Sequence, residues 1–311
     1  MDARSRTLAV NGLQMSVTEQ GEGPLVVLCH GWPESAHSWR HQMPALAQAG
    51  FHVVAPDMRG YGHTSAPPDI ADYSIFDLVG DVVDLVRVLG ERQAIVVGHD
   101  WGANVAWHAA LFRPDVFRAV AGLSVPPPQR GPTPPLQALR KAGIEHFYWD
   151  YFQPPGVAEA EFERDVERTL RTVLFGRISL VMTRGAGFLG DQPAPAQLPS
   201  WLNANDLAAM VERFRHSGFR GGLNWYRNID RNWALTAPWQ DAKIHQPSLF
   251  VAGAKDPVIT GVLGQRRLAT MEEVLPGLTA KVLIEGAGHW IQQERPGEVN
   301  DALLAFIRRL G

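Results

Sequence analysis

Short, wholly apolar segments alternate with amphipathic segments over the first 125 residues. The apolar segments end at glycine, aspartate or proline and are typical of strands buried on both faces; they are residues 24–31, 51–57, 93–100 and 117–126. Residues 75–90 and 101–112 carry apolar side chains at helical spacing, and residues 7–20 form a predicted hairpin that turns at Asn11-Gly12. This alternation predicts a parallel sheet with helices on both faces.

The alternation is interrupted in the middle of the chain. Residues 126–135 hold six prolines without periodicity, which indicates a linker or a boundary. The sequence that follows is helical in character and contains no buried strand, until strands resume within 247–257 and 278–289. We therefore predict a core made of residues 1–125 and 237–311, closed by an amphipathic helix and interrupted by a helical insertion over 126–236.

Composition narrows the class of protein. The 311 residues include 45% hydrophobic and 20% charged side chains, as in a folded globular protein, and the net charge of −3 lacks the basic excess of a nucleic-acid binder. The single cysteine, Cys29, excludes an internal disulfide and a multi-cysteine metal site, and it reads as a small core residue. Because we find neither a secretory signal nor an apolar run of about 20 residues, we expect a cytoplasmic protein without a membrane partner.

Polar residues follow several of the predicted strands, and ligands bind beyond the carboxyl ends of strands in such sheets. Asp100 lies at the centre of Gly98-His99-Asp100-Trp101-Gly102, the spacing of a nucleophile elbow, in which esterases place serine. An aspartate before a helix could also be a plain helix cap. Asp256 and His289 follow two later strands, so the chain order is nucleophile, acid, base, as in an α/β-hydrolase triad.

The motifs around these positions resemble those of the α/β-hydrolase superfamily and, within it, the epoxide hydrolases. They are HGWPESAHSWR, APDMRGYGHTSAP, GHDWGANVAW and GAGHW. The resemblance covers nearly the whole chain. It implies an α/β-hydrolase fold, with a mostly parallel eight-stranded sheet flanked by helices and with the insertion as a helical cap.

Two segments of the insertion, 148–156 and 218–228, resemble the cap segments of soluble epoxide hydrolases that each carry a catalytic tyrosine. Matched residue by residue, these tyrosines are Tyr148 and Tyr226. Tyr151 is a neighbouring candidate for the first role, although packing within the cap is the interpretation that we favour for it.

The resemblance implies a reaction without a metal or an organic cofactor, between a small hydrophobic epoxide and water. Asp100 would attack a ring carbon, the two tyrosines would donate to the epoxide oxygen, and His289, oriented by Asp256, would activate water. The backbone N–H groups of Trp32 and Trp101 would form the oxyanion hole.

Tryptophan is unusually frequent, with 10 residues. The predicted substrate pocket comprises Trp32, Trp101, Trp225, Tyr151 and Trp290. We expect a monomer or a homodimer.

Two other functions remain open at this stage. A haloalkane or haloacid dehalogenase uses the same aspartate nucleophile. However, resemblance to the haloalkane enzymes would predict asparagine where this chain has Trp32. A halide leaving group also needs no proton from a tyrosine. A ligand receptor on the same fold would not need the charged triad. An esterase is disfavoured because Asp100 replaces serine and no other G-x-S-x-G segment occurs.

Overall fold

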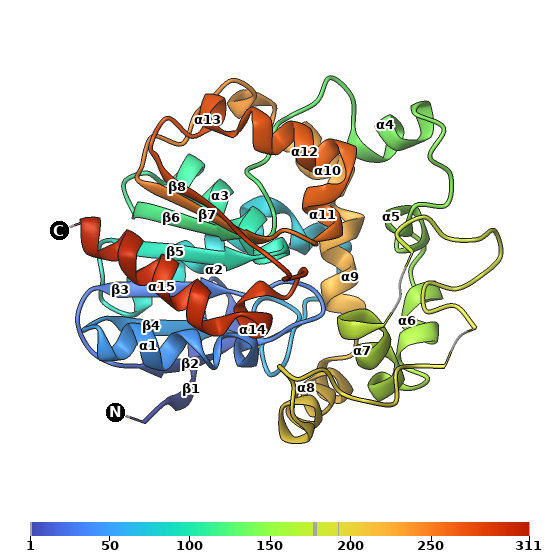
Figure 1. Cartoon of the computed structure of the whole chain (residues 1–311), viewed down its shortest axis with the longest axis horizontal. Helices are drawn as coiled ribbons and strands as arrows, with labels where there is room; N and C mark the ends of the chain where they lie inside the picture. Colours follow the sequence, from blue (N-terminus) through green and yellow to red (C-terminus); the bar gives the residue numbers. More distant parts are fainter. Residues whose placement is uncertain (1, 177–178, 192, 311) are drawn as a thin grey trace. The chain divides into compact units, whose positions relative to one another are not determined.

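The computed structural model describes residues 2–176, 179–191 and 193–310 (Figure 1). Its internal contacts group into two units. The core unit comprises Met1–Met58, Leu78–Gln129 and Asp241–Gly311, and the cap unit comprises Arg59–Asp77 and Arg130–Gln240. The cap unit thus contains most of the predicted insertion and also the segment Arg59–Asp77, which the sequence pattern did not separate from the core. The boundaries at 126 and 236 stay a prediction.

The core unit is built on an eight-stranded sheet in the order β1-β2-β4-β3-β5-β6-β7-β8. The strands are β1 (Arg4–Val10), β2 (Leu13–Gln20), β3 (Leu25–Cys29), β4 (His52–Pro56), β5 (Ala94–His99), β6 (Phe117–Leu123), β7 (Ser248–Gly253) and β8 (Leu278–Ile284). The β1–β2 hairpin and the β2–β4 pair are antiparallel, and all other pairs are parallel. The predicted fold class and hairpin are confirmed.

Helices cover both faces of this sheet (Figure 1). On one face, α1 (Gln42–Gln48) and α15 (Pro296–Ile307) bury their apolar stripes against alternate residues of the central strands. On the other face, α3 (Trp101–Phe112) packs so closely on β6 that a Cβ at Gly122 would lie 2.2 Å from the Trp107 ring. The remaining core helices are α2 (Ile75–Val88), α11 (Pro257–Thr260), α12 (Val262–Ala269), α13 (Met271–Val274) and α14 (Ile291–Glu294).

The cap unit is helical, as the sequence predicts. Its helices are α4 (Pro135–Lys141), α5 (Tyr148–Tyr151), α6 (Val157–Phe162), α7 (Val166–Phe175), α8 (Ala204–Ser217), α9 (Arg220–Arg227) and α10 (Ile229–Leu235). An aromatic cluster forms its centre: the Phe152 ring contacts Phe162, Phe188 and Tyr226 in edge-to-face geometry. These rings give short helices such as α5 the tertiary support that they cannot supply by themselves.

Candidate active site

Three side chains that follow three different strands meet at one edge of the sheet. Asp100 follows β5, Asp256 follows β7 and His289 follows β8. The His289 Nδ1 atom lies 2.8 Å from Asp256 Oδ2, and its Nε2 atom lies 3.5 Å from Asp100 Oδ2. The structure therefore brings together the three residues that the sequence placed at separate strand ends, since the carboxyl ends of parallel strands share one edge.

Asp100 occupies a sharp turn between β5 and α3. Its φ of 52° and ψ of −119° are unusual for a residue with a side chain and cost on the order of 1–3 kcal/mol. The flanking glycines make this turn possible. A Cβ at Gly98 would lie 2.0 Å from the Gly102 carbonyl oxygen, and one at Gly102 would lie 2.0 Å from the Cys29 carbonyl oxygen. The Asp100 carboxylate makes no capping hydrogen bond to α3, so the helix-cap interpretation loses its support.

The two oxygens of Asp100 have different surroundings. The backbone N–H of Trp32 donates to Oδ1 at 2.8 Å, whereas Oδ2 faces His289. A Cβ at Gly31 would lie 2.4 Å from the Asp100 Cβ, so only glycine lets the loop after β3 come this close. Trp101, the other predicted oxyanion-hole residue, begins α3 directly after Asp100.

The carboxylates of Asp256 and Asp100 make the His289 imidazole more basic. Burial alone lowers the pKa of the imidazole, but the negative charge of Asp256 and hydrogen bonds to Asp100 and Asp256 outweigh it and raise the pKa well above its ordinary value. The imidazole therefore interacts with two carboxylates at once, one that orients it and one that it can assist.

A buried ion pair lies behind the triad, and the sequence analysis did not identify it. Glu34 and His99 are both wholly inaccessible to solvent. His99 Nδ1 lies 2.7 Å from Glu34 Oε2, and His99 Nε2 lies 2.8 Å from the carbonyl oxygen of His289. Both partners are oxygen acceptors, so each ring nitrogen of His99 is placed to donate a hydrogen bond. Gln292 and Gln293 donate to the other Glu34 oxygen.

This ion pair links the loop after β3 to the loop that carries His289. Besides His99, the Glu34 carboxylate accepts the backbone N–H of Gly31, next to Trp32. Ser124 Oγ also donates to the His289 carbonyl, at 2.7 Å. By contrast, His30 donates from Nδ1 to Gly31 O and accepts the Met58 N–H at Nε2, so this histidine stabilises the loop after β3.

The Glu34→Gln variant should be markedly less stable. Burial raises the pKa of Glu34, but the charge of His99 and its hydrogen bonds prevail and hold it at about 2, below the ordinary 4.5. Removing the carboxylate deprives buried His99 of its ion-pair partner, and breaking a buried pair in this way costs about 3–5 kcal/mol. Chemical denaturation at pH 7 measures the loss, and the exposed Glu22→Gln should change the free energy of unfolding by less than about 0.5 kcal/mol.

The same depressed pKa predicts a pH dependence. A carboxyl whose pKa is lower in the folded protein stabilises it above the unfolded pKa, so this contribution should fade as the pH falls from about 4.5 towards 2. The variant should lack this part of the acid transition. Equal stability of Glu34→Gln and the parent protein at pH 7 would contradict the assignment of the ion pair.

Within the cap unit, the structure brings Tyr148 of α5 and Tyr226 of α9 together. Their ring centroids are 5.8 Å apart and their planes meet at 69°. Tyr151 behaves differently, since its hydroxyl donates to Glu161 Oε2 at 2.9 Å. Burial and this carboxylate raise the pKa of Tyr151. The hydroxyl thus has a structural partner, which supports the packing role that we favoured for it.

The predicted pocket tryptophans differ in their surroundings. Trp290 stands edge-on to His289, with ring centroids 4.8 Å apart, and Trp32 and Trp101 are only 5% and 9% exposed. Trp225 is wholly buried in the cap unit and donates from Nε1 to the Arg59 carbonyl at 3.1 Å. A packing role accounts for that indole, and its place in a substrate pocket stays a prediction.

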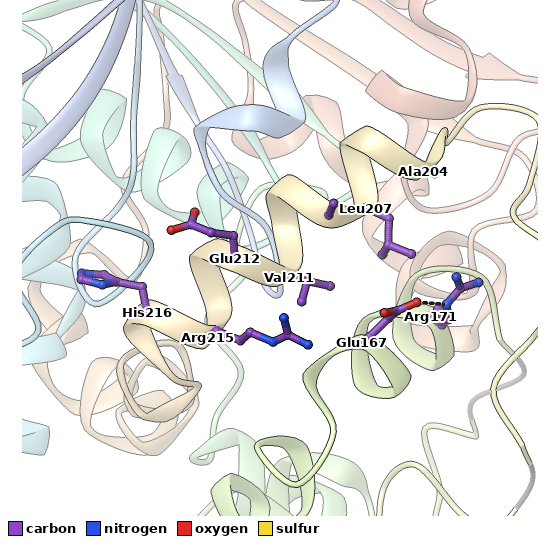
Figure 2. Close-up of a pocket in the computed structure, with 9 residues that line it drawn as sticks. Glu167, Arg171, Ala204, Leu207, Val211, Glu212, Arg215 and His216 are labelled. Carbon is purple, nitrogen blue, oxygen red and sulfur yellow. Dashed lines mark hydrogen bonds and ion pairs between the residues drawn. The ribbon is translucent and has the colours of Figure 1, made fainter.

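Two open pockets lie on the cap unit. Among the described residues that line them, neither pocket includes Asp100, Asp256 or His289. The first, with a volume of about 490 Å³, lies between α7 and α8, where Glu167, Arg171 and Arg215 surround Leu207 and Val211 (Figure 2). The second, of about 690 Å³, is lined by residues that include Tyr151.

The described residues also bear on other functions. They contain no cluster of three or more histidine, cysteine or acidic side chains arranged to hold a metal ion. None of their helices combines the length and the apolar character that crossing a bilayer requires.

Comparisons with known proteins agree with this geometry. A family model described as alpha/beta hydrolase fold matches residues 24–296. The chain is 47% identical to epoxide hydrolase A of Mycobacterium tuberculosis, over 98% of this chain and 97% of that protein. It is 40% identical to an epoxide hydrolase of Caballeronia sordidicola, over 97% and 92% of the two proteins.

Solved structures give the same result. The crystal structure of epoxide hydrolase A from Mycobacterium thermoresistibile is 48% identical and matches with a TM-score of 0.94, covering 99% of this chain and 98% of that one. An epoxide hydrolase from Vigna radiata matches with the same TM-score at 39% identity, over 99% and 98% of the two chains. Sequence motifs, fold and relatives together show that this chain belongs to the α/β-hydrolase fold family and, within it, to the epoxide hydrolases.

Proposed function

We propose that this protein converts an epoxide into a vicinal diol in two steps, through an ester at Asp100. The observation that carries the proposal is that the two carboxylate oxygens of Asp100 have different neighbours. Oδ1 accepts the Trp32 N–H, while Oδ2 faces His289. One oxygen is thus held where negative charge can be stabilised, and the other is placed to react.

In the first step, Oδ2 attacks a ring carbon of the epoxide and the carbon–oxygen bond of the ring breaks. An alkoxide is a poor leaving group unless it gains a proton or a hydrogen bond as it forms. The phenols of Tyr148 and Tyr226 supply these, and one of them gives up its proton. A phenol has a reference pKa near 10, so it is still protonated at neutral pH and able to donate.

In the second step, His289 takes a proton from water and the resulting hydroxide attacks Cγ of Asp100. Negative charge then develops on Oδ1, next to the Trp32 N–H and the predicted second donor, Trp101. The Cγ–Oδ2 bond breaks, the diol leaves with Oδ2 and takes the proton from His289. The new carboxyl group loses a proton, which restores the tyrosine, so the sum is epoxide plus water giving diol.

The charge on His289 supports this order of events. In the free protein, the carboxylates of Asp100 and Asp256 together raise the pKa of His289. Esterification removes the charge of Asp100, so we expect the pKa of His289 to fall when the ester forms. The imidazole then becomes neutral at the stage when a base for water is needed.

The Tyr148→Phe/Tyr226→Phe double variant should lose ring opening far more than either single variant. One phenol can still protonate the alkoxide when the other is removed, whereas the double variant has no donor. General acids contribute about 10²–10⁴-fold, so we expect a loss of ester formation of at least that size. Stopped-flow measurement of ester formation tests this, with Tyr151→Phe as the matched control.

A damaging Tyr151→Phe change with a harmless Tyr148→Phe change would show that the first donor is misassigned.

The substrate is expected to be small and hydrophobic. A diol assay over a panel of epoxides, with Asp100→Ala as the blank, is the experiment that tests the proposed activity. The cytoplasmic location and the monomeric or homodimeric state stay predictions.

A further inference from the structure

We infer that Arg227 and Gln153 are positioning residues for ring opening, because they fix the two tyrosine-bearing helices of the cap unit against each other. The inference rests on the proposed donor role of Tyr148 and Tyr226. These tyrosines are far apart in the sequence and must present their hydroxyls to one epoxide oxygen. Reacting groups tolerate misplacement of only about 0.5 Å, so something must set their mutual position.

Helix α5 cannot hold Tyr148 by itself. It has only four residues, a single turn, and an isolated turn is not stable in water. Its orientation must therefore come from contacts with other parts of the cap unit. On its N-terminal side, the Tyr148 N–H donates to the Leu180 carbonyl at 2.9 Å.

The C-terminal side of α5 is held by the residue next to the second tyrosine. Arg227, which ends α9, donates from Nε to the carbonyl oxygens of Phe152 and Gln153, at 3.0 and 3.3 Å. Its Nη2 atom lies 3.3 Å from the Pro154 carbonyl. Carbonyls just after a helix lack partners within the helix, and a cation there is favourable. The guanidinium thus binds the segment that leaves α5.

Glu159 fixes the plane of that guanidinium. Its carboxylate oxygens lie 2.8 Å from Arg227 Nη1 and 3.0 Å from Nη2, and the Arg227 side chain is only 3% exposed. Paired contacts of this kind define orientation as well as distance, and a buried pair is little screened by solvent. Asn224, one turn earlier on α9, accepts from Nη1 at 2.9 Å.

Gln153 supplies a second cross-link. Its side-chain amide donates to the Trp149 carbonyl in α5 at 2.8 Å and to the Tyr226 carbonyl in α9 at 3.2 Å. A single amide group therefore ties the backbone next to Tyr148 to the backbone of Tyr226 itself. Together with Arg227, it restrains the same pair of helices through independent hydrogen bonds.

The test separates positioning from mere stability of the cap. We expect Arg227→Met to slow ester formation by about 10²-fold, the cost of a misplacement near 1 Å, and to leave ester hydrolysis unchanged. Single-turnover kinetics measure the two steps separately. Arg171→Met is the matched control, because Arg171 also contacts a carboxylate, Glu167, and two backbone carbonyls, and these three partners lie outside α5 and α9. It should leave both steps unchanged.

A Tyr226→Phe background gives a second readout. With one donor left, the mutual position of the two phenols no longer matters, so Arg227→Met should slow ester formation much less there than in the parent protein. The inference is overturned if Arg227→Met leaves ester formation unchanged, slows both steps alike, or has the same effect in both backgrounds. Should Arg227→Met fail to fold, Gln153→Leu is judged by the same criteria.

Failure of the inference and failure of the proposed function give different results. If the single and double tyrosine variants in the parent background keep normal ester formation, the donor assignment is wrong and the positioning role falls with it. If those variants lose ester formation but Arg227→Met and Gln153→Leu do not, only the positioning role is wrong.

Discussion

The Asp100→Ala protein is expected to fold like the parent and to form no diol from any epoxide. Without the carboxylate there is no group to attack the ring carbon, and no ester can form. Loss of a covalent nucleophile costs on the order of 10⁶-fold in turnover in a well-studied case, so activity should fall below detection. Product analysis with a panel that includes styrene oxide measures the effect, and circular dichroism with thermal melting checks the fold.

Asp115→Ala, at an exposed aspartate of the core unit, is the matched control and should keep full activity. A single turnover in oxygen-18 water sharpens the assignment. The first diol should carry unlabelled oxygen from Oδ2, and the peptide containing Asp100 should gain the label. Retained turnover of Asp100→Ala would exclude it as nucleophile. Chloride release from a haloalkane by the parent protein, without diol formation from epoxides, would instead favour a dehalogenase.

The sequence predicts the triad because its members are tied to secondary structure. Asp100 and Asp256 come shortly after the apolar, wholly buried strands β5 and β7, His289 comes after the half-exposed edge strand β8, and parallel strands end at a common edge. The glycines at 98 and 102 identify the turn, since close backbone approach leaves no room for a side chain there. Local pattern therefore specifies both the fold and the position of these residues.

The ion pair of Glu34 and His99 is not predictable in the same way. Both residues lie in motifs quoted from the sequence, but glutamate side chains are mostly exposed in proteins and histidine side chains are seldom wholly buried. Their burial depends on how segments remote in the sequence close over them, including Gln292 and Gln293 near the C-terminus. Likewise, the partner that distinguishes Tyr151 from Tyr148 is Glu161, on a different helix, which no spacing rule connects to α5.

The His289→Gln protein is expected to form the ester and then stop. Asp100 is already ionised, so ring opening needs no base, and Oδ2 remains able to attack. Hydrolysis does need one, because water is a poor nucleophile until it loses a proton, and glutamine cannot accept it. We expect steady-state turnover to fall by about 10²–10⁴-fold, while the first turnover proceeds. Intact mass spectrometry should show the protein heavier by one substrate molecule.

Two variants make this result specific. His245→Gln, at an exposed histidine of the core unit, should turn over normally and accumulate no adduct. The Asp100→Ala/His289→Gln double variant should form no adduct, which places the ester on Asp100 rather than on another nucleophile. Normal steady-state turnover of His289→Gln would remove it as the base. A complete lack of adduct would mean that the imidazole is also required for ring opening. In that case its charge next to Oδ2 would orient the carboxylate, in addition to the role of the imidazole as the base for water.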